Sequence, residues 1–146
     1  MNGKLEIYKE LKYPNLSYTE YEVTSKATKA YNCFAWAAKE DDRWWSPEPD
    51  GFWRDGVPRE LTIEAVNQVY QTLGYEPCEN ADLEPGFEKI AIYVTSDGEP
   101  QHAARQLPNG KWTSKLGNWE DISHELEGLA NQMFYGEVKQ ILKRTL

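Results

Sequence analysis

The sequence predicts an α+β fold in which a short helix that carries Cys33 packs on an antiparallel β-sheet. Helix formers follow Asn32, and an apolar run at residues 89–95 is typical of a buried strand. A turn at residues 108–110 separates two segments that are typical of a β-hairpin. In this order, the elements favour a sheet packed on the helix, which would bring Cys33 close to the hairpin.

The N-terminal elements are predicted from alternation, capping and turn residues. Residues 5–11 alternate apolar and polar side chains and predict a strand, which a turn at residues 14–15 follows. Asn32 is a good N-cap, so we expect a helix from this residue to Lys39. Residues 41–53 hold too many prolines and turn residues for regular structure, so we expect a long aromatic loop there.

The C-terminal elements follow from helical spacing and from strand patterns. Apolar side chains recur with helical spacing from Thr62 to Leu73, and Gly74 ends that helix. The remaining expectations are a polar loop at 76–86, a strand at 89–95, hairpin strands at 102–107 and 111–116, an acidic helix start at 121–125, and a solvated edge or helix end at 139–144.

Length and composition indicate one globular domain over residues 1–146. A chain of 146 residues can bury a core without disulfides or metals, and 40% of its residues are hydrophobic and 13% aromatic. The mean hydropathy of −0.76 and the lack of a long apolar run exclude a membrane-spanning helix. The start of the chain has no basic segment followed by an apolar one, so we expect a cytoplasmic protein.

The charge balance restricts the partners. Sixteen Lys and Arg against 24 Asp and Glu give a net charge of −8, and no basic cluster is present to bind phosphates. We therefore expect no nucleic-acid partner. An acidic surface suits solubility or a basic protein partner.

Cys33 is the candidate nucleophile. At the start of a helix, unpaired backbone N–H groups lower the pKa of a thiol and can also hold an oxyanion. The alternative is a small buried hydrophobic side chain, which is what most free cysteines are. Cys78 has no histidine or cysteine companion, so two free thiols and no metal site are expected.

His102 is the candidate base, because the chain has only one other histidine, His124. A three-residue hairpin loop would place His102 opposite Leu116 and on the same face as Ser114 and Asn118. A catalytic imidazole needs an acceptor on its second nitrogen, and the candidates are Ser114, Asn118 and Asp121. We favour Asp121, because a carboxylate also raises the basicity of the imidazole. The alternatives are a structural role for His102 and a solvated His124 that at most assists the site.

Aromatic and basic side chains supply candidate substrate contacts. Trp44, Trp45 and Trp53 could form the rim of a cleft for a small-molecule or peptide substrate, or they could pack an irregular loop onto the core. Arg105 and Lys115 are expected on the hairpin face away from His102. They could bind a substrate carboxylate or pair with acidic side chains.

An early cysteine at a helix start, a histidine that opens a later hairpin strand and a polar third residue resemble the papain-like cysteine hydrolases. The most similar branch is that of the small bacterial amidases and peptidases, which includes peptidoglycan endopeptidases. The resemblance implies Cys33 as nucleophile, His102 as base and acid, an orienting residue near Asp121, and backbone N–H groups at Cys33 for the oxyanion. No cofactor is implied, because acyl transfer on a thiol needs none.

Two departures from that branch concern the site. The branch usually has an aspartate before its cysteine and a second histidine on the following strand, where this chain has Asn32 and either Ser114 or Asn118. Residues from about 32 to 144 also resemble an uncharacterised bacterial domain of unknown function, which suggests no substrate. The segments that carry this resemblance are 32–38, 102–106, 112–117 and 121–122.

Three functions are compatible with the sequence. The first is a cysteine hydrolase or acyltransferase that acts on an amide or ester through a thioacyl intermediate. The second is a non-catalytic acidic binding module, such as an immunity or inhibitor protein, with the tryptophan-rich loop at its interface. The third is a papain-like domain that has lost catalysis and retains only an interaction.

Overall fold

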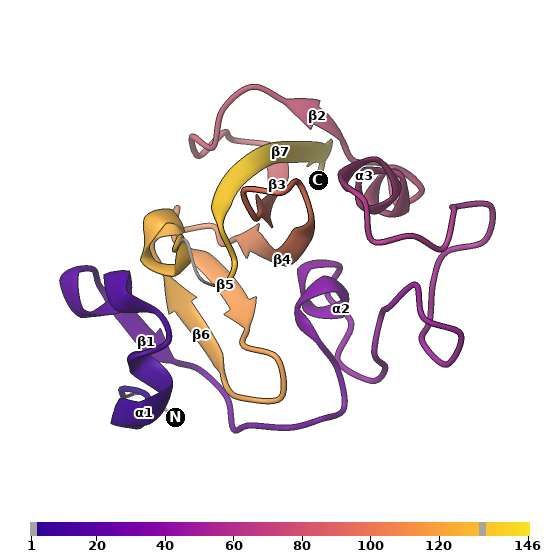
Figure 1. Cartoon of the computed structure of the whole chain (residues 1–146). Coiled ribbons are helices and arrows are strands. Elements are labelled where there is room, and N and C mark those ends of the chain that lie inside the picture. The colour runs from indigo at the N-terminus through magenta and orange to yellow at the C-terminus, as the bar shows by residue number, and fades with distance from the viewer. Residues whose placement is uncertain (1–2, 132–133) are drawn as a thin grey trace.

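A seven-stranded antiparallel sheet organises the described part of the chain, residues 3–131 and 134–146 of the computed structural model (Figure 1). Its strand order is β1-β6-β5-β4-β3-β7-β2. The strands are β1 (Tyr21–Val23), β2 (Glu76–Cys78), β3 (Phe87–Val94), β4 (Pro100–Gln106), β5 (Trp112–Lys115), β6 (Asp121–His124) and β7 (Glu137–Thr145). The helices are α1 (Ile7–Glu10), α2 (Cys33–Ala37) and α3 (Ile63–Gln71), with the 3-10 helices η1 (Pro14–Tyr18) and η2 (Leu126–Leu129).

The predicted fold class, a papain-like α+β fold built on the Cys33 helix, is wrong. α2 has only five residues and rises about 7 Å, so it covers a small part of the sheet. Residues 121–125 and 139–144, which were expected outside the sheet, contribute to β6 and β7. β7 lies between β3 and β2, where its main chain pairs on both sides. The sheet and its pairing, rather than a helix packed on a sheet, determine the architecture.

Two apolar clusters pack on the two faces of the sheet. Alternate residues of β3 divide between them, because successive side chains of a strand point to opposite faces. Ile90 and Ile92 belong to the cluster formed with α2 and α3, and Ala91 and Tyr93 belong to the other. Figure 1 shows α2 and α3 on one side of the sheet and α1 with the 3-10 helix η2 on the other.

Several local predictions are confirmed. The Asn32 side chain caps α2 by accepting a hydrogen bond from the Ala35 N–H, and Thr62 caps α3 in the same way. The hairpin has the expected three-residue loop: Gln106 pairs with Trp112, and the Leu107 N–H donates to the Lys111 carbonyl at 2.7 Å. Residues 41–53 lack regular structure apart from one bridge between Trp45 and Phe52.

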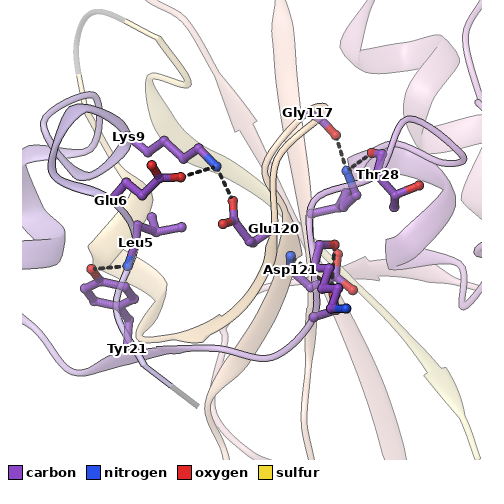
Figure 2. Close-up of polar contacts among 11 residues, drawn as sticks. Leu5, Glu6, Lys9, Tyr21, Thr28, Gly117, Glu120 and Asp121 are labelled. Carbon is purple, nitrogen blue, oxygen red and sulfur yellow. Dashed lines mark hydrogen bonds and ion pairs between the residues drawn. The ribbon is translucent and has the colours of Figure 1, made fainter. Parts of the chain in front are cut away.

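The strand predicted at residues 5–11 is wrong. Residues 7–10 of this segment form α1. Among its alternating apolar side chains only Leu5 is buried, whereas Ile7 and Leu11 are exposed, so the alternation does not mark a strand face that packs on a core. The Leu5 N–H donates to the Tyr21 hydroxyl, and Lys9 Nζ contacts Glu6 at 3.3 Å and Glu120 at 2.9 Å (Figure 2). These contacts hold the N-terminal segment against β1 and the turn between β5 and β6.

The longest α-helix in the described ranges, α3, has nine residues. None of the helices there has both the length and the apolar character to cross a membrane.

Candidate functional site

Cys33 is the first residue of α2 and is 8% exposed. The preceding Asn32 holds this helix start in place: its Oδ1 accepts from the Ala35 N–H at 3.3 Å and from the Trp45 N–H at 3.0 Å, and its Nδ2 donates to the Trp45 carbonyl at 2.6 Å. The predicted oxyanion or orienting residue Asn32 therefore joins α2 to the following loop. These hydrogen bonds hold the backbone at the start of α2 and therefore the position of the thiol.

The thiol of Cys33 is neutral at pH 7. Burial raises its pKa to about 11, although the backbone N–H groups of Ala103 and Phe34 favour the thiolate. Ala103 can supply its N–H because β4 and β5 pair only near their turn, at Arg105↔Thr113 and Gln106↔Trp112. The helix start thus provides donors around the sulfur, but desolvation outweighs them.

His102 belongs to a buried hydrogen-bonded chain of side chains. Its Nε2 lies 2.8 Å from Ser114 Oγ, and the same oxygen lies 2.7 Å from Nε2 of His124. His124 Nδ1 in turn lies 2.7 Å from the backbone carbonyl of Glu125. His102, Ser114 and His124 are all fully buried. Three adjacent strands, β4, β5 and β6, therefore contribute one group each to the chain.

The direction of the hydrogen bonds in this chain follows from its last acceptor. The Glu125 carbonyl can only accept, so His124 carries its proton on Nδ1 and accepts on Nε2. The Ser114 hydroxyl has one proton and donates it to His124, so its oxygen accepts from Nε2–H of His102. His102 Nδ1 is then an unprotonated lone pair, and it has no hydrogen-bond partner within the described residues.

Both imidazoles in the chain are neutral. Burial, and secondarily the neighbouring His124, hold the pKa of His102 well below its usual range. Burial lowers the pKa of His124 to about 4, although its bond to Glu125 favours the charged form. Neutral rings agree with the donors and acceptors deduced above for these hydrogen bonds.

Tyrosine rings enclose the His102 imidazole. The Tyr135 ring stacks on it with centroids 4.1 Å apart and planes 10° apart, and the Tyr93 ring meets it edge-on at 5.3 Å. The Tyr13 hydroxyl lies 3.2 Å from that of Tyr135. The imidazole is therefore fixed by stacking on its face and by Ser114 at one nitrogen.

The two residues of the predicted catalytic pair meet the same strand, β4, from opposite faces of the sheet and are not bonded to each other. The thiol of Cys33 contacts the backbone of Ala103, the residue after His102, yet no hydrogen bond joins Cys33 to His102 in the described ranges. Five cavities on the described chain are lined by other residues, and neither Cys33 nor His102 is among them. The structure thus contains a buried neutral thiol on the α2 side of the sheet and a buried neutral imidazole on the opposite face, among Tyr93 and Tyr135.

Ser114, rather than the favoured Asp121, is the partner of the imidazole. Asp121 pairs with Lys115 in the sheet and so lies on the opposite face from Ser114. There it accepts a hydrogen bond from the Tyr31 hydroxyl at 2.7 Å, and burial raises its carboxyl pKa. Asn118 is exposed in the turn between β5 and β6.

His124 is the site residue that sequence reasoning missed. The prediction of a solvated side chain in a helix start is wrong, because His124 ends strand β6 and is fully buried. A signal was present in the alternation of residues 121–124, with Ile122 and His124 on one face. The pairing of β6 with β5 places that face beside Ser114.

The three candidate tryptophans have different environments. Trp45 and Trp53 are buried in the core, so they have almost no surface to offer a ligand, whereas Trp44 is 38% exposed. Trp45 packs on Tyr70 and on Phe52. The tryptophans thus anchor the loop that follows α2, and Trp44 alone among them retains contact area.

Arg105 and Lys115 lie on the α2 side of the hairpin. Lys115 Nζ donates to the Thr28 carbonyl at 2.8 Å and to the Gly117 carbonyl (Figure 2). The Arg105 guanidinium lies 5.3 Å from the centre of the Trp36 ring, and its Nε has no partner among the described residues. Lys115 is therefore satisfied by the backbone, whereas Arg105 retains unused donors.

No group of three or more His, Cys, Asp or Glu side chains in the described ranges could hold a metal ion. Cys33 and Cys78 are both free thiols.

Comparison with known proteins places the chain in a family. No curated protein and no solved structure matches it, and the comparisons give no support to the papain-like superfamily. A family model described as "Domain of unknown function (DUF7689)" matches residues 22–143, which include α2, α3, strands β2 to β6 in full and most of β1 and β7. The chain belongs to this family of domains of unknown function, DUF7689.

Proposed function

We propose that the protein is a cysteine hydrolase or acyltransferase that acts on an amide or ester bond, with Cys33 as nucleophile and His102 as general base. The observation that carries the proposal is the direction of the chain from His102 through Ser114 to His124. It leaves Nδ1 of His102 as a lone pair with no partner in the described structure, one residue before Ala103, whose backbone N–H contacts the thiol from the α2 side of the sheet. A base needs that form of imidazole.

The neutral state of both groups determines the order of proton transfer. Because the two groups start on opposite faces of the sheet, the proposed proton path from Sγ to His102 Nδ1 runs between β4 and β5 where these strands are unpaired. The proton moves as Sγ attacks the carbonyl carbon, and the carbonyl electron pair moves to oxygen. When the tetrahedral intermediate collapses, the bond to the leaving group breaks and the leaving group takes the proton from Nδ1. The product of this half-reaction is a thioester on Cys33.

The second half-reaction returns the enzyme to its starting state. Water, or another nucleophile in a transferase, gives its proton to Nδ1 and attacks the thioester, and the proton then returns to Sγ as the S–C bond breaks. Backbone N–H groups at the start of α2 would stabilise the oxyanion. Ser114 and His124 keep the imidazole in the tautomer that both steps require.

The rate of Cys33 alkylation by iodoacetamide from pH 4 to 10 tests this proposal. Cys78→Ser removes the second thiol, and the Cys33→Ser, Cys78→Ser double variant gives the background. An active pair predicts modification below the ordinary thiol pKa of about 8.5 that His102→Ala abolishes. A thiol that reacts only near pH 11, equally with and without the imidazole, would show that Cys33 is an inert core residue. Circular dichroism of each variant establishes that it is folded.

An acidic binding module is the second candidate, and one observation favours it. Residues 40–64 hold eight acidic and three basic side chains, so this segment carries −5 of the net charge of −8. Most of the acidic side chains there are exposed, and Trp44 is exposed beside them. Buried Trp45 and Trp53 hold the segment in place. A rigid acidic surface with an aromatic contact suits a basic protein partner.

Binding to a basic protein distinguishes this candidate. Cytochrome c can serve as a generic basic probe, and isothermal titration at 20 and 200 mM salt would report salt-sensitive association. Asp41→Asn with Asp42→Asn should weaken it, whereas Glu76→Gln on the far strand β2 should not. Equal effects of the two changes would indicate non-specific attraction by net charge.

A further inference from the structure

A cavity of about 610 Å³ opens at the turn end of β4, away from Cys33 and His102. Apolar side chains form much of its wall, namely Leu83, Pro85, Phe87, Leu107 and Pro108. Arg105, at the end of β4, also lines it. The volume is that of a site for a small organic molecule.

The two acidic side chains in the wall are already neutralised. Glu84 contacts Lys89 at 3.2 Å and Lys143 at 3.1 Å. Glu88 contacts Lys39 at 2.6 Å and Arg144 at 3.1 Å, and it also accepts from the Tyr75 hydroxyl at 2.9 Å. Each carboxylate therefore faces two cations. The charged side chains that line the cavity balance, with Lys39 and Arg105 against Glu84 and Glu88. Lys89, Lys143 and Arg144 contact these carboxylates from outside the wall and bring the group to three more positive than negative charges, in a chain whose net charge is −8.

Arg105 is the cation in this group that lacks an ion pair within the described residues. Its Nε is buried and has no hydrogen-bond partner there, and its guanidinium packs beside the Trp36 ring at 5.3 Å. Leaving a buried charged donor without a partner is unfavourable. A guanidinium can bind a carboxylate through two parallel N–H groups, so one without a protein partner suits an acid ligand.

We propose that this cavity binds a small organic carboxylate, with the acid group on Arg105 and an apolar body against Leu83, Phe87 and Leu107. An ionised carboxylate offsets the local excess of positive charge and supplies acceptors for the unused donors of Arg105. The apolar wall excludes water around that ion pair and selects an acid with a hydrophobic chain or ring. The site is separate from the proposed catalytic pair, because neither Cys33 nor His102 lines it.

Isothermal titration of the full chain with 4-phenylbutanoate and with 4-phenylbutanamide tests the proposal. The acid should bind saturably, and the uncharged amide should bind about tenfold more weakly or worse, since a hydrogen bond to a charged group is lost. Arg105→Gln should weaken the acid by a similar factor and leave the amide unchanged. Arg105→Lys, which retains the charge without the planar fork, should fall between the two.

Arg54→Gln is the matched control, because it removes one arginine charge outside the cavity and should leave acid binding unchanged. Equal affinity for the acid and the amide would overturn the proposal, as would acid binding that Arg105→Gln does not alter. So would the absence of saturable acid binding at concentrations up to about 10 mM, which exceed the Kd of a weak site. The comparison of acid with amide uses the unchanged protein, so it decides the matter even if Arg105→Gln unfolds. Alkylation of Cys33 is read independently and does not depend on this result.

Discussion

The two faces of the β4–β5 hairpin treat buried polar groups in opposite ways. On one face His102 and Ser114 join His124 in a series of neutral groups that, among the described residues, hydrogen-bond only to one another and to one carbonyl. On the other face Arg105 and Lys115 place cations beside aromatic rings, at 5.3 Å from Trp36 and 5.1 Å from Tyr31. The first face holds a proton acceptor and the second holds positive charge. The proposed base and the proposed carboxylate site thus lie on opposite faces of one hairpin, with Cys33 on the face of Arg105.

The largest expected difference in stability comes from two glycines, one next to a residue that packs on each face of the hairpin. Gly136, beside Tyr135, has φ +77°, and a Cβ there would overlap the Val94 carbonyl. Gly117, whose carbonyl accepts from Lys115, has φ +60° with open space around it. Gly136→Ala should therefore lower the free energy of unfolding by about 4 kcal/mol or more, against about 1 kcal/mol for Gly117→Ala.

Urea denaturation of the two glycine variants measures this difference. Similar losses at both positions would mean that the strand end at Val94 can move, and that Tyr135 is not held firmly on His102.

Acid should destabilise the fold through the buried neutral imidazoles of His102 and His124. His124 binds a proton near pH 4 when folded and near pH 6.5 when unfolded, so its contribution is complete above pH 6.5 and disappears as the pH falls to 4. The shift corresponds to about 3 kcal/mol, and the lowered pKa of His102 acts in the same direction. Between pH 7, 5.5 and 4, the free energy of unfolding should therefore fall more steeply for the unsubstituted protein than for His124→Gln, in which position 124 does not titrate. Parallel pH profiles would indicate that His124 is accessible to water.

Ser114→Ala should cost about 2 to 3 kcal/mol, because both buried Nε2 atoms lose their partner. On the other face Thr113→Ala removes the acceptor of Trp36 Nε1, at 2.9 Å, but that ring is only half-buried and water can replace the bond. We expect about 1 kcal/mol there. Denaturant midpoints of the two variants give the comparison, and a larger loss for Thr113→Ala would reverse it.

The smallest effect is expected for Lys115→Met. The change removes two hydrogen bonds to carbonyls, which destabilises the fold. It also removes an ammonium group whose burial is unfavourable and lowers its pKa, which stabilises the fold. These two contributions oppose each other. The free energy of unfolding should change by less than about 1 kcal/mol. Lys115→Ala, which also deletes the apolar stem, is the control and should be clearly less stable. A loss with Lys115→Met as large as that with Ser114→Ala would show that the cation is essential to the fold.

Local signals predicted the elements whose causes are local. Asn32 and Thr62 cap their helices through their own side chains, and the turn at residues 108–110 sets the register that places Ser114 on the face of His102. The strand at 5–11 and the helix start at 121–125 were wrong for one shared reason. Short segments take their conformation from what they pack against, and a pattern of four to seven residues does not specify that partner.

By itself, the sequence determined the candidate groups: a capped helix with Cys33 at its start, and a hairpin that presents His102 and Ser114 together. Only the tertiary structure decided their chemistry. Pairing of β6 with β5 brought His124 to Ser114 and so set the tautomer of His102, and burial between the sheet and α2 made the thiol neutral. Proton positions and pKa values depend on neighbours and desolvation from distant segments, and these are absent from any local pattern.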